Sequence, residues 1–242
     1  MSQLTLTGAG KSAGMNVATY TVTTTGAQTH TIQSLGVSAP TVVDWGDGSR
    51  DTYSGTALRT HNYAGAGTWL VTIYTPKNVV TFDIRDNKVT LNSAQIAGML
   101  NISTFSATTL KAGTFNSADV SAWRPTTFSL YSMPAGYSVT ADGGWANWIT
   151  TTTFQVQSNG LLTATVDAIL WELYQATLAR TATGGTINVG GTNQAPSGVF
   201  QAASACPVSA ATSGKEIAHE LLNDGCGGIA SGRVWSSVIF TP

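Results

Sequence analysis

Charge is scarce in this chain of 242 residues. Lys and Arg number 11 and Asp and Glu number 12, so charged residues make up 10% of the chain, against roughly 25% in an average soluble domain. The net charge is −1 and no basic run is present, which argues against nucleic-acid binding, because phosphates need a basic patch. This balance favours β-rich surfaces that pack in assemblies or face the extracellular world over a cytosolic enzyme.

Long apolar runs and cysteine are also in short supply. No stretch reaches the roughly 18 apolar residues of a membrane span, so we expect no membrane partner. Residues 1–7 alternate like a strand and lack a charged segment followed by an apolar one, so we expect no signal peptide. Two cysteines, Cys206 and Cys226, are too few for a disulfide framework. We interpret them as two buried thiols, with a single disulfide as the alternative.

Motifs for catalysis and metal binding are incomplete. Residues 7–12 end in Gly-Lys-Ser, but Thr5 stands where a P-loop needs its first glycine. His219 and Glu220 begin an H-E-x-x-H zinc motif, yet Asn223 occupies the second histidine position. We therefore expect no enzyme activity, no cofactor and no metal site. A pair of carboxylates brought together by folding is the remaining enzymatic alternative.

Short strand-like segments alternate with turn signals over residues 1–75. Residues 43–49, Val-Asp-Trp-Gly-Asp-Gly-Ser, are followed by His-Asn-Tyr at 61–63 and by a glycine-led strand at 67–73. This order resembles the polycystic-kidney-disease (PKD) domain family, with its W-G-D-G turn, H-x-Y step and following strand. The resemblance implies an immunoglobulin-like β-sandwich, with Trp45 in the core and Asp47 bracing the turn. Further strands are expected at 19–22, 30–32 and 41–43.

A calcium site is the functional alternative for this turn. Asp44, Asp47 and Asp51 supply the oxygen ligands that calcium prefers. The spacing of an EF-hand loop is absent, so a hairpin turn braced by its own side chains is the favoured interpretation.

Residues 76–242 contain an internal repeat. Residues 79–89 fit the leucine-rich-repeat pattern, in which an apolar lead is followed five residues later by Asn87. Successive leads are 23, 23, 26 and 33 residues apart. A lone repeat cannot bury its apolar edge, so we expect the repeats to stack in parallel with their phenylalanines in a ladder. The leads are Phe82, Phe105, Phe128, Phe154 and Ile187.

Helical returns are expected between the repeats. Helices are predicted at 93–100, at 165–176 with Thr165 as N-cap, and at 213–223. Residues 235–240 are predicted to form a closing strand or sixth repeat, and Asn87 and Asn159 to hydrogen-bond the backbone of their turns. The region resembles a degenerate leucine-rich-repeat solenoid, so the predicted fold is mainly β with some α: an immunoglobulin-like β-sandwich at 1–75 and a leucine-rich-repeat-like parallel β solenoid with helical returns at 76–242.

The side chains between the buried leads should face outward. They form a polar sheet face that we predict to bind a glycan or a neighbouring subunit, with solvation of the sheet as the alternative. Trp145 and Trp148 are interpreted as core or interface residues, with sugar stacking as the alternative. One predicted column is Asp83, Ser106, Ser129, Gln155 and Asn188, and the next is Arg85, Thr108, Tyr131, Gln157 and Gly190.

A PKD-like unit followed by repeats, with a Thr- and Ser-rich surface, resembles the virion proteins of tailed phages. That resemblance implies a non-enzymatic tail, collar or head-attached protein, located in the virion, whose partners are other virion proteins and copies of itself. The alternative is an extracellular or cell-surface adhesin that binds a host glycan through the sheet face.

Overall fold

The protein is described by a computed structural model that covers residues 16–199, 211 and 213–241. It is mainly β, with 40% strand and 18% helix, which confirms the predicted class at that level. The strands are β1 (Val17–Thr25), β2 (Gln28–Asp44), β3 (Arg50–Tyr63), β4 (Ala66–Tyr74), β5 (Val79–Ile84), β6 (Val89–Asn92), β7 (Thr104–Thr108), β8 (Ala112–Asn116), β9 (Thr127–Tyr131), β10 (Ser138–Thr140), β11 (Thr153–Gln155), β12 (Thr186–Asn188) and β13 (Ser237–Ile239). The 3₁₀ helices are η1 (Pro76–Asn78), η2 (Ser117–Val120) and η3 (Trp145–Asn147), and the α-helices are α1 (Ser93–Ile96), α2 (Thr163–Leu178) and α3 (Gly214–Leu222).

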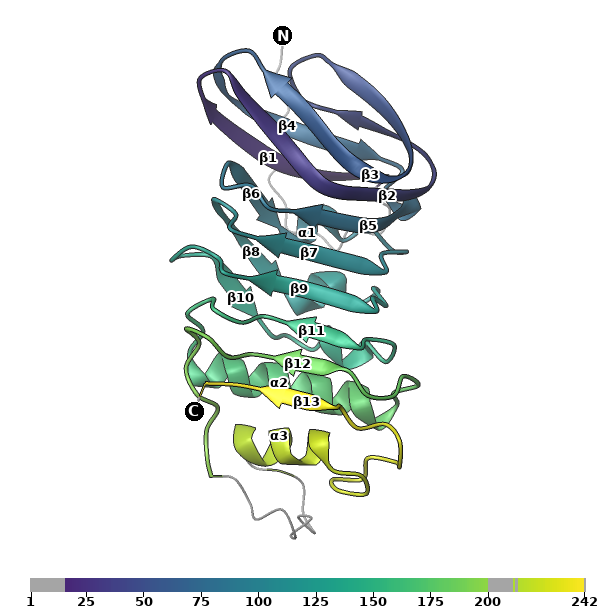
Figure 1. Cartoon of the computed structure of the whole chain (residues 1–242), viewed down its shortest axis with the longest axis vertical. Coiled ribbons are helices and arrows are strands. Elements are labelled where there is room, and N and C mark those ends of the chain that lie inside the picture. Colours follow the sequence, from purple (N-terminus) through teal and green to yellow (C-terminus); the bar gives the residue numbers. More distant parts are fainter. Residues whose placement is uncertain (1–15, 200–210, 212, 242) are drawn as a thin grey trace.

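Within the described residues, all 13 strands belong to one mixed sheet. Its order is β10-β8-β6-β1-β4-β2-β5-β7-β9-β11-β12-β13, and β3 pairs with β2 off this path. Strands β5, β7, β9, β11, β12 and β13 form one parallel ladder, and β6, β8 and β10 form a second. In Figure 1 the second ladder lies beside the β5, β7 and β9 part of the first and ends at β10.

The predicted phenylalanine ladder is confirmed. Phe82 pairs in register with Phe105, Phe105 with Phe128, and Phe128 with Phe154. The ring centroids are 6.3, 5.5 and 5.3 Å apart in that order, and all four rings are buried. Ile187 of β12 and Val238 of β13 continue the same row. The predicted closing strand is therefore the sixth parallel strand of this ladder.

Strands β1 to β4 form an antiparallel unit that joins both ladders. The predicted strands at 19–22, 30–32, 41–43 and 67–73 lie inside the longer β1, β2 and β4. Strand β1 pairs antiparallel with β6, and β2 pairs antiparallel with β5. Hydrogen bonding therefore crosses the predicted boundary between residues 75 and 76, and the division into two domains stays a prediction. This pairing also covers the strand edges that the first repeat would otherwise expose.

The helices differ from their predictions at the ends. Helix α2 begins at Thr163 with Leu162 as its N-cap residue, so the prediction of Thr165 as cap is wrong. The predicted helix at 93–100 is shorter, because α1 ends at Ile96. Helix α3 is confirmed, and its start is fixed by a capping box in which Ser213 and Glu216 bond each other's backbone N–H. In Figure 1, α2 lies behind β12 and β13, and α3 lies below β13.

Asparagines and a cysteine fix the turns near the C-terminal end. Asn159 donates to the carbonyls of Leu130 and Val156, which confirms its predicted role. The side-chain oxygen of Asn193 accepts hydrogen bonds from the backbone N–H groups of Asn159 and Leu161, a role that was not predicted. Cys226 is buried and disulfide-bonded, so the interpretation as a thiol is wrong there. Cys206 lies outside the described residues.

Candidate functional site

The outward face of the β5–β13 ladder carries columns of polar side chains. Because the phenylalanines point inward, the residues on either side of each lead point outward. The first predicted column, which begins at Asp83 and ends at Asn188, is brought together by the register, and Ile239 extends it on β13. Of the second predicted column, which begins at Arg85, Thr108 and Tyr131 are paired directly. The assignment of these columns as a binding face stays a prediction.

A further column, which we call the threonine column, was missed from sequence. It comprises the outward residue that precedes each lead, and its members pair in register from β5 to β13. Each is half-buried. The signal was visible in the chain, because Thr-Phe recurs at the first four leads and Thr-Ile at the fifth. Its members are Thr81, Thr104, Thr127, Thr153, Thr186 and Ser237.

Three hydroxyl side chains form the recessed part of this face, and we call them the hydroxyl patch. Ser106, Thr108 and Ser129 are 8%, 6% and 6% exposed. Ser129 Oγ donates to Gln155 Oε1 at 3.0 Å. The hydroxyls of Ser106 and Thr108 make no hydrogen bond to any residue that the structure describes. Gln157 Oε1 is buried and likewise has no hydrogen-bond partner.

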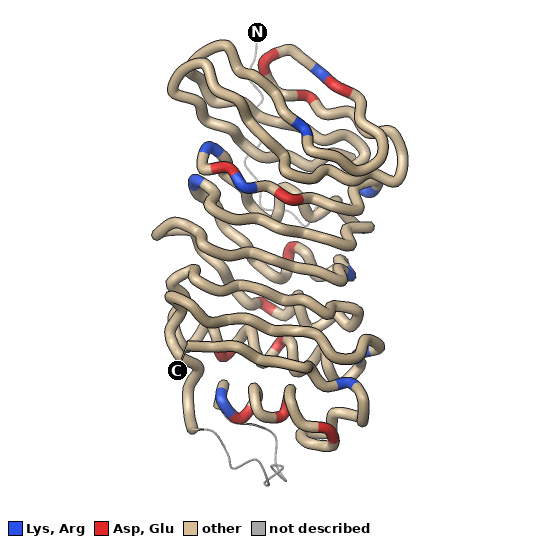
Figure 2. The backbone as a smooth tube through the Cα atoms, viewed as in Figure 1, with Lys and Arg blue, Asp and Glu red and all other residues tan. Residues whose placement is uncertain are grey.

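Charge on this face is confined to its N-terminal end. Arg85 and Asp83 of the first repeat form an ion pair at 2.8 Å. Strands β7, β9, β11, β12 and β13 carry no Lys, Arg, Asp or Glu, and the tubes of these strands are tan in Figure 2. A shallow polar depression of about 290 Å³ adjoins the ion pair. It is lined by Thr29, Thr31, Gln33, Arg85, Asp86, Asn87, Lys88 and Thr109.

A buried polar chain lies behind this depression and was not predicted. Tyr20 Oη is 2.9 Å from His30 Nε2, and His30 Nδ1 is 2.8 Å from Asp86 Oδ2. Tyr20 and His30 are fully buried. Burial lowers the pKa of His30 below its usual value, although the hydrogen bond to Asp86 opposes that effect. Burial alone would raise the pKa of Asp86, but hydrogen bonds from His30 and Lys88 outweigh it and lower the pKa to about 2.

This chain of groups ties the antiparallel unit to the first repeat. Tyr20 lies on β1, His30 on β2 and Asp86 in the turn after β5. A neutral His30 satisfies both contacts, because Nδ1–H donates to Asp86 while Nε2 accepts from Tyr20. The geometry is that of a hydrogen-bonded acid–base pair, but no solvent reaches the imidazole.

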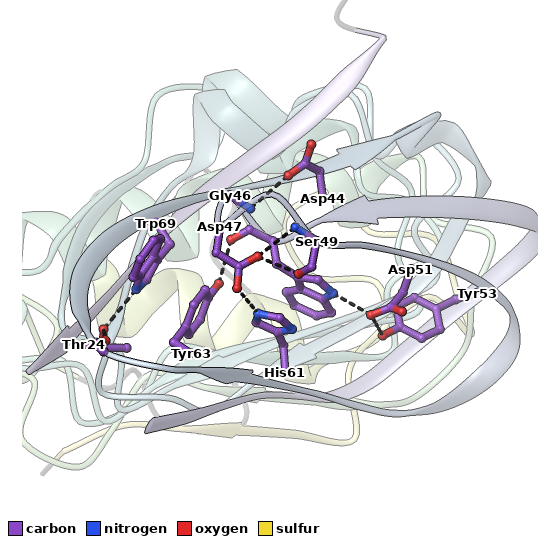
Figure 3. A network of polar contacts seen from close by, with 12 residues as sticks. Thr24, Asp44, Gly46, Asp47, Ser49, Asp51, Tyr53, His61, Tyr63 and Trp69 are labelled. Atoms are coloured by element: carbon purple, nitrogen blue, oxygen red, sulfur yellow. Dashed lines mark hydrogen bonds and ion pairs between the residues drawn. The ribbon is translucent and has the colours of Figure 1, made fainter. Parts of the chain in front are cut away.

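The W-G-D-G turn is braced by its own carboxylates (Figure 3). Asp47 accepts from Ser49 N at 3.0 Å and from His61 Nε2 at 2.7 Å, and the His61 ring stacks on Trp45 with centroids 4.9 Å apart. Hydrogen bonds from Ser49 and His61 lower the pKa of Asp47 to about 2, against the opposing effect of burial. Gly46 has φ +85°, and a Cβ there would lie 2.6 Å from the carbonyl oxygen of Leu70.

The three aspartates of this turn are engaged separately. Asp44 accepts from Gly46 N and from Arg50, while Asp51 accepts from Trp45 Nε1 and from Tyr53. Their oxygens therefore do not converge on one point, which favours the braced turn over the calcium alternative. Trp45 is fully buried, in agreement with the position that the resemblance implied.

Trp145 and Trp148 lie in the core, at 0% and 1% exposure, so the sugar-stacking alternative is wrong for both. Their loop is held by Glu172 of α2, which accepts from the backbone N–H of Gly143 and Trp145 and from Ser117 Oγ. Burial raises the pKa of Glu172 despite these hydrogen bonds.

The second histidine position of the H-E-x-x-H pattern remains an asparagine with a different role. At the position where H-E-x-x-H needs its second histidine, Asn223 donates to the carbonyl of His219. Residues 7–12 lie outside the described residues. Across 16–199, 211 and 213–241, no three His, Cys, Asp or Glu side chains gather as metal ligands, and no helix of that part is long and apolar enough to cross a membrane.

Comparison with known proteins adds no relative. No protein-family model matches the chain, and neither the curated proteins nor the solved structures compared with it include a similar one.

Proposed function

We propose that this chain is a non-enzymatic structural protein of a tailed-phage particle, in a tail, collar or head-attached position, that mediates assembly and surface attachment. The observation that carries the proposal is the hydroxyl-rich outward face, which runs in register over six parallel strands and is uncharged on the last five of them. A rigid stack with a regular neutral face suits repeated lateral contacts, because it offers many hydrogen-bonding groups without long-range repulsion between copies.

The finer fold is part of the same proposal. We infer that residues 1–75 form an immunoglobulin-like unit of the PKD type and that residues 76–242 form a leucine-rich-repeat-like solenoid. The turn network around Asp47 and His61 supports the first inference. The in-register phenylalanine ladder and the carbonyl hydrogen bonds of Asn159 support the second.

The buried acidic and basic groups support a non-enzymatic role. His30 and Tyr20 are sealed from solvent, so the one acid–base chain described above is closed to a substrate. Both carboxylate oxygens of Glu172 accept hydrogen bonds from backbone N–H groups of a single loop. Both sets of contacts are accounted for by holding segments of the fold together.

Immunogold labelling tests the virion assignment. Antibody raised against the purified chain should label density-purified particles from the source culture, at one fixed place on each particle. Light scattering coupled to size-exclusion chromatography should find the purified chain as a homo-oligomer. Labelling of cells alone, with bare particles, would overturn the virion assignment in favour of the cell-surface adhesin. That alternative is favoured by the same outward face, which is rich in sugar-compatible hydroxyls.

A further inference from the structure

The floor of the outward face contains polar groups that lack partners. Ser106 and Thr108 are more than nine-tenths buried on the outward side of β7, and their hydroxyls bond no other described residue. The buried Oε1 of Gln157 also lacks a partner. Buried polar atoms without hydrogen bonds are costly in folded proteins. Gln157 Oε1 is such an atom, and the hydroxyls of Ser106 and Thr108 have no protein partner among the described residues, so this floor offers a place where an external donor or acceptor fits.

The groups around this floor match the chemistry of a sugar. Hydroxyls and a side-chain amide both donate and accept, as the hydroxyls of a sugar do. Tyr131, half-buried beside Thr108, adds an aromatic ring at the rim. The nearest charges, Asp83 and Arg85, neutralise each other. An anionic or cationic polymer would find no counter-charge on strands β7, β9, β11, β12 and β13, so a neutral ligand fits this face best.

The spacing of the rows adds a length requirement. Neighbouring parallel strands lie about 4.8 Å apart, so the six members of the threonine column span roughly 24 Å. An extended β-linked hexose chain advances by nearly the same distance for each sugar. A sugar chain that lies along the stacking direction can thus place one sugar over each strand of the ladder, which we call a rung. The sugar hydroxyls would then face the threonine column and the hydroxyl patch.

We propose that this face binds an extended chain of neutral sugars along its stacking direction, with the hydroxyl patch as the main contact. The inference rests on the attachment role proposed above. It names a neutral polysaccharide as the class of surface molecule to which the protein attaches. Recognition depends on hydrogen bonds shared over successive rungs, so binding to a single sugar is weak and affinity grows with chain length.

Calorimetric titration of the full chain tests this inference. The probes are linear gluco-, manno- and chito-oligosaccharides, each in a series from disaccharide to octasaccharide. For at least one series, affinity should rise with length up to about five or six sugars, the number of rungs that the ~4.8 Å spacing covers, and then level off. Failure of all three series to bind, or binding without length dependence, overturns the proposal.

Matched variants locate the contact. Ser106→Ala and Thr108→Val remove a hydroxyl with little change in shape, and each should weaken binding roughly three- to tenfold. Thr52→Val, at an exposed site on β3, is the control and should bind like the parent chain. Equal binding by all three variants overturns the location. Loss of self-association in Ser106→Ala without any sugar binding would instead assign the face to a second copy.

The two proposals fail separately. If the antibody labels particles but the purified chain binds none of the oligosaccharides, only the sugar inference is overturned. A chain that binds long oligosaccharides but is absent from particles overturns only the virion assignment.

Discussion

Replacing Phe128 with alanine should be among the most damaging single changes in this protein. The side chain is fully buried, with ring centroids 5.5 Å from Phe105, 5.3 Å from Phe154 and 5.0 Å from Trp148. Truncating a buried phenylalanine to alanine costs about 3–5 kcal/mol. We expect the upper part of that range, because the surrounding strands are held by hydrogen bonds on both sides and cannot collapse into the cavity.

Urea unfolding measures this loss. The chain contains 7 tryptophans, and Trp145 and Trp148 lie against Phe128, so tryptophan fluorescence reports directly on the ladder. Since domains are stable by about 5–15 kcal/mol, the variant should lose a third or more of its free energy of unfolding. Leu100→Ala is the control, because Leu100 is 53% exposed and its truncation should change stability by about 0.5 kcal/mol or less.

Two outcomes would refute this reasoning. A loss below about 1 kcal/mol in Phe128→Ala, well under the usual range, would mean that the phenylalanine row does not hold the stack together. A Phe128→Leu variant that loses as much as Phe128→Ala would show that filled volume is not what matters, because leucine leaves a much smaller cavity than alanine.

The buried polar groups yield three more predictions. Thermal stability should fall as pH drops below about 6.5, because His30 takes up a proton in the unfolded state but resists protonation when it is buried in the folded state. It should fall further below about pH 4, because the pKa of Asp86 is about 2 in the folded state and the unfolded state therefore takes up a proton first. A melting temperature that is unchanged from neutral pH to pH 4 contradicts this prediction. Glu172→Gln should lose about 1–3 kcal/mol in urea unfolding, since the amide NH₂ would face a backbone N–H, and parental stability would contradict the loop-holding role. Arg180→Met should lower the calorimetric melting temperature, because the buried Arg180 guanidinium, whose pKa burial lowers to about 10, bonds the carbonyls of Thr151 and Gly184; an unchanged melting temperature would show that these contacts are dispensable.

The stacking of the chain was predictable because its signals are local and repeated. Leads such as Phe82 and Phe105 recur at intervals of 23, 23, 26 and 33 residues and are followed by alternating apolar residues, so both the inward row and the outward columns could be placed. The helix at 213–223 is signalled equally locally, whereas its capping box of Ser213 and Glu216 was not predicted. The threonine column carried a signal of the same kind, visible as recurring Thr-Phe pairs.

The rest depended on contacts that sequence spacing does not encode. Strand β3 is exposed on both faces over most of its length, so it lacks the apolar alternation that marks a strand. Only its last three residues, His-Asn-Tyr at 61–63, carry a recognisable motif. His30 and Asp86 are separated by 56 positions, and no local pattern pairs them. The short strands of the second ladder, such as β10, have too few residues to show a period.

The antiparallel strands that close one end of both ladders make the length of this protein adjustable by gene duplication. A copied segment of 23 residues, the interval from Phe82 to Phe105, would enter as an extra rung between existing ones and leave the closing strands and α3 untouched. Each such event would extend the outward face by about 4.8 Å. Reach toward a target would then evolve in fixed steps, independently of the N-terminal unit.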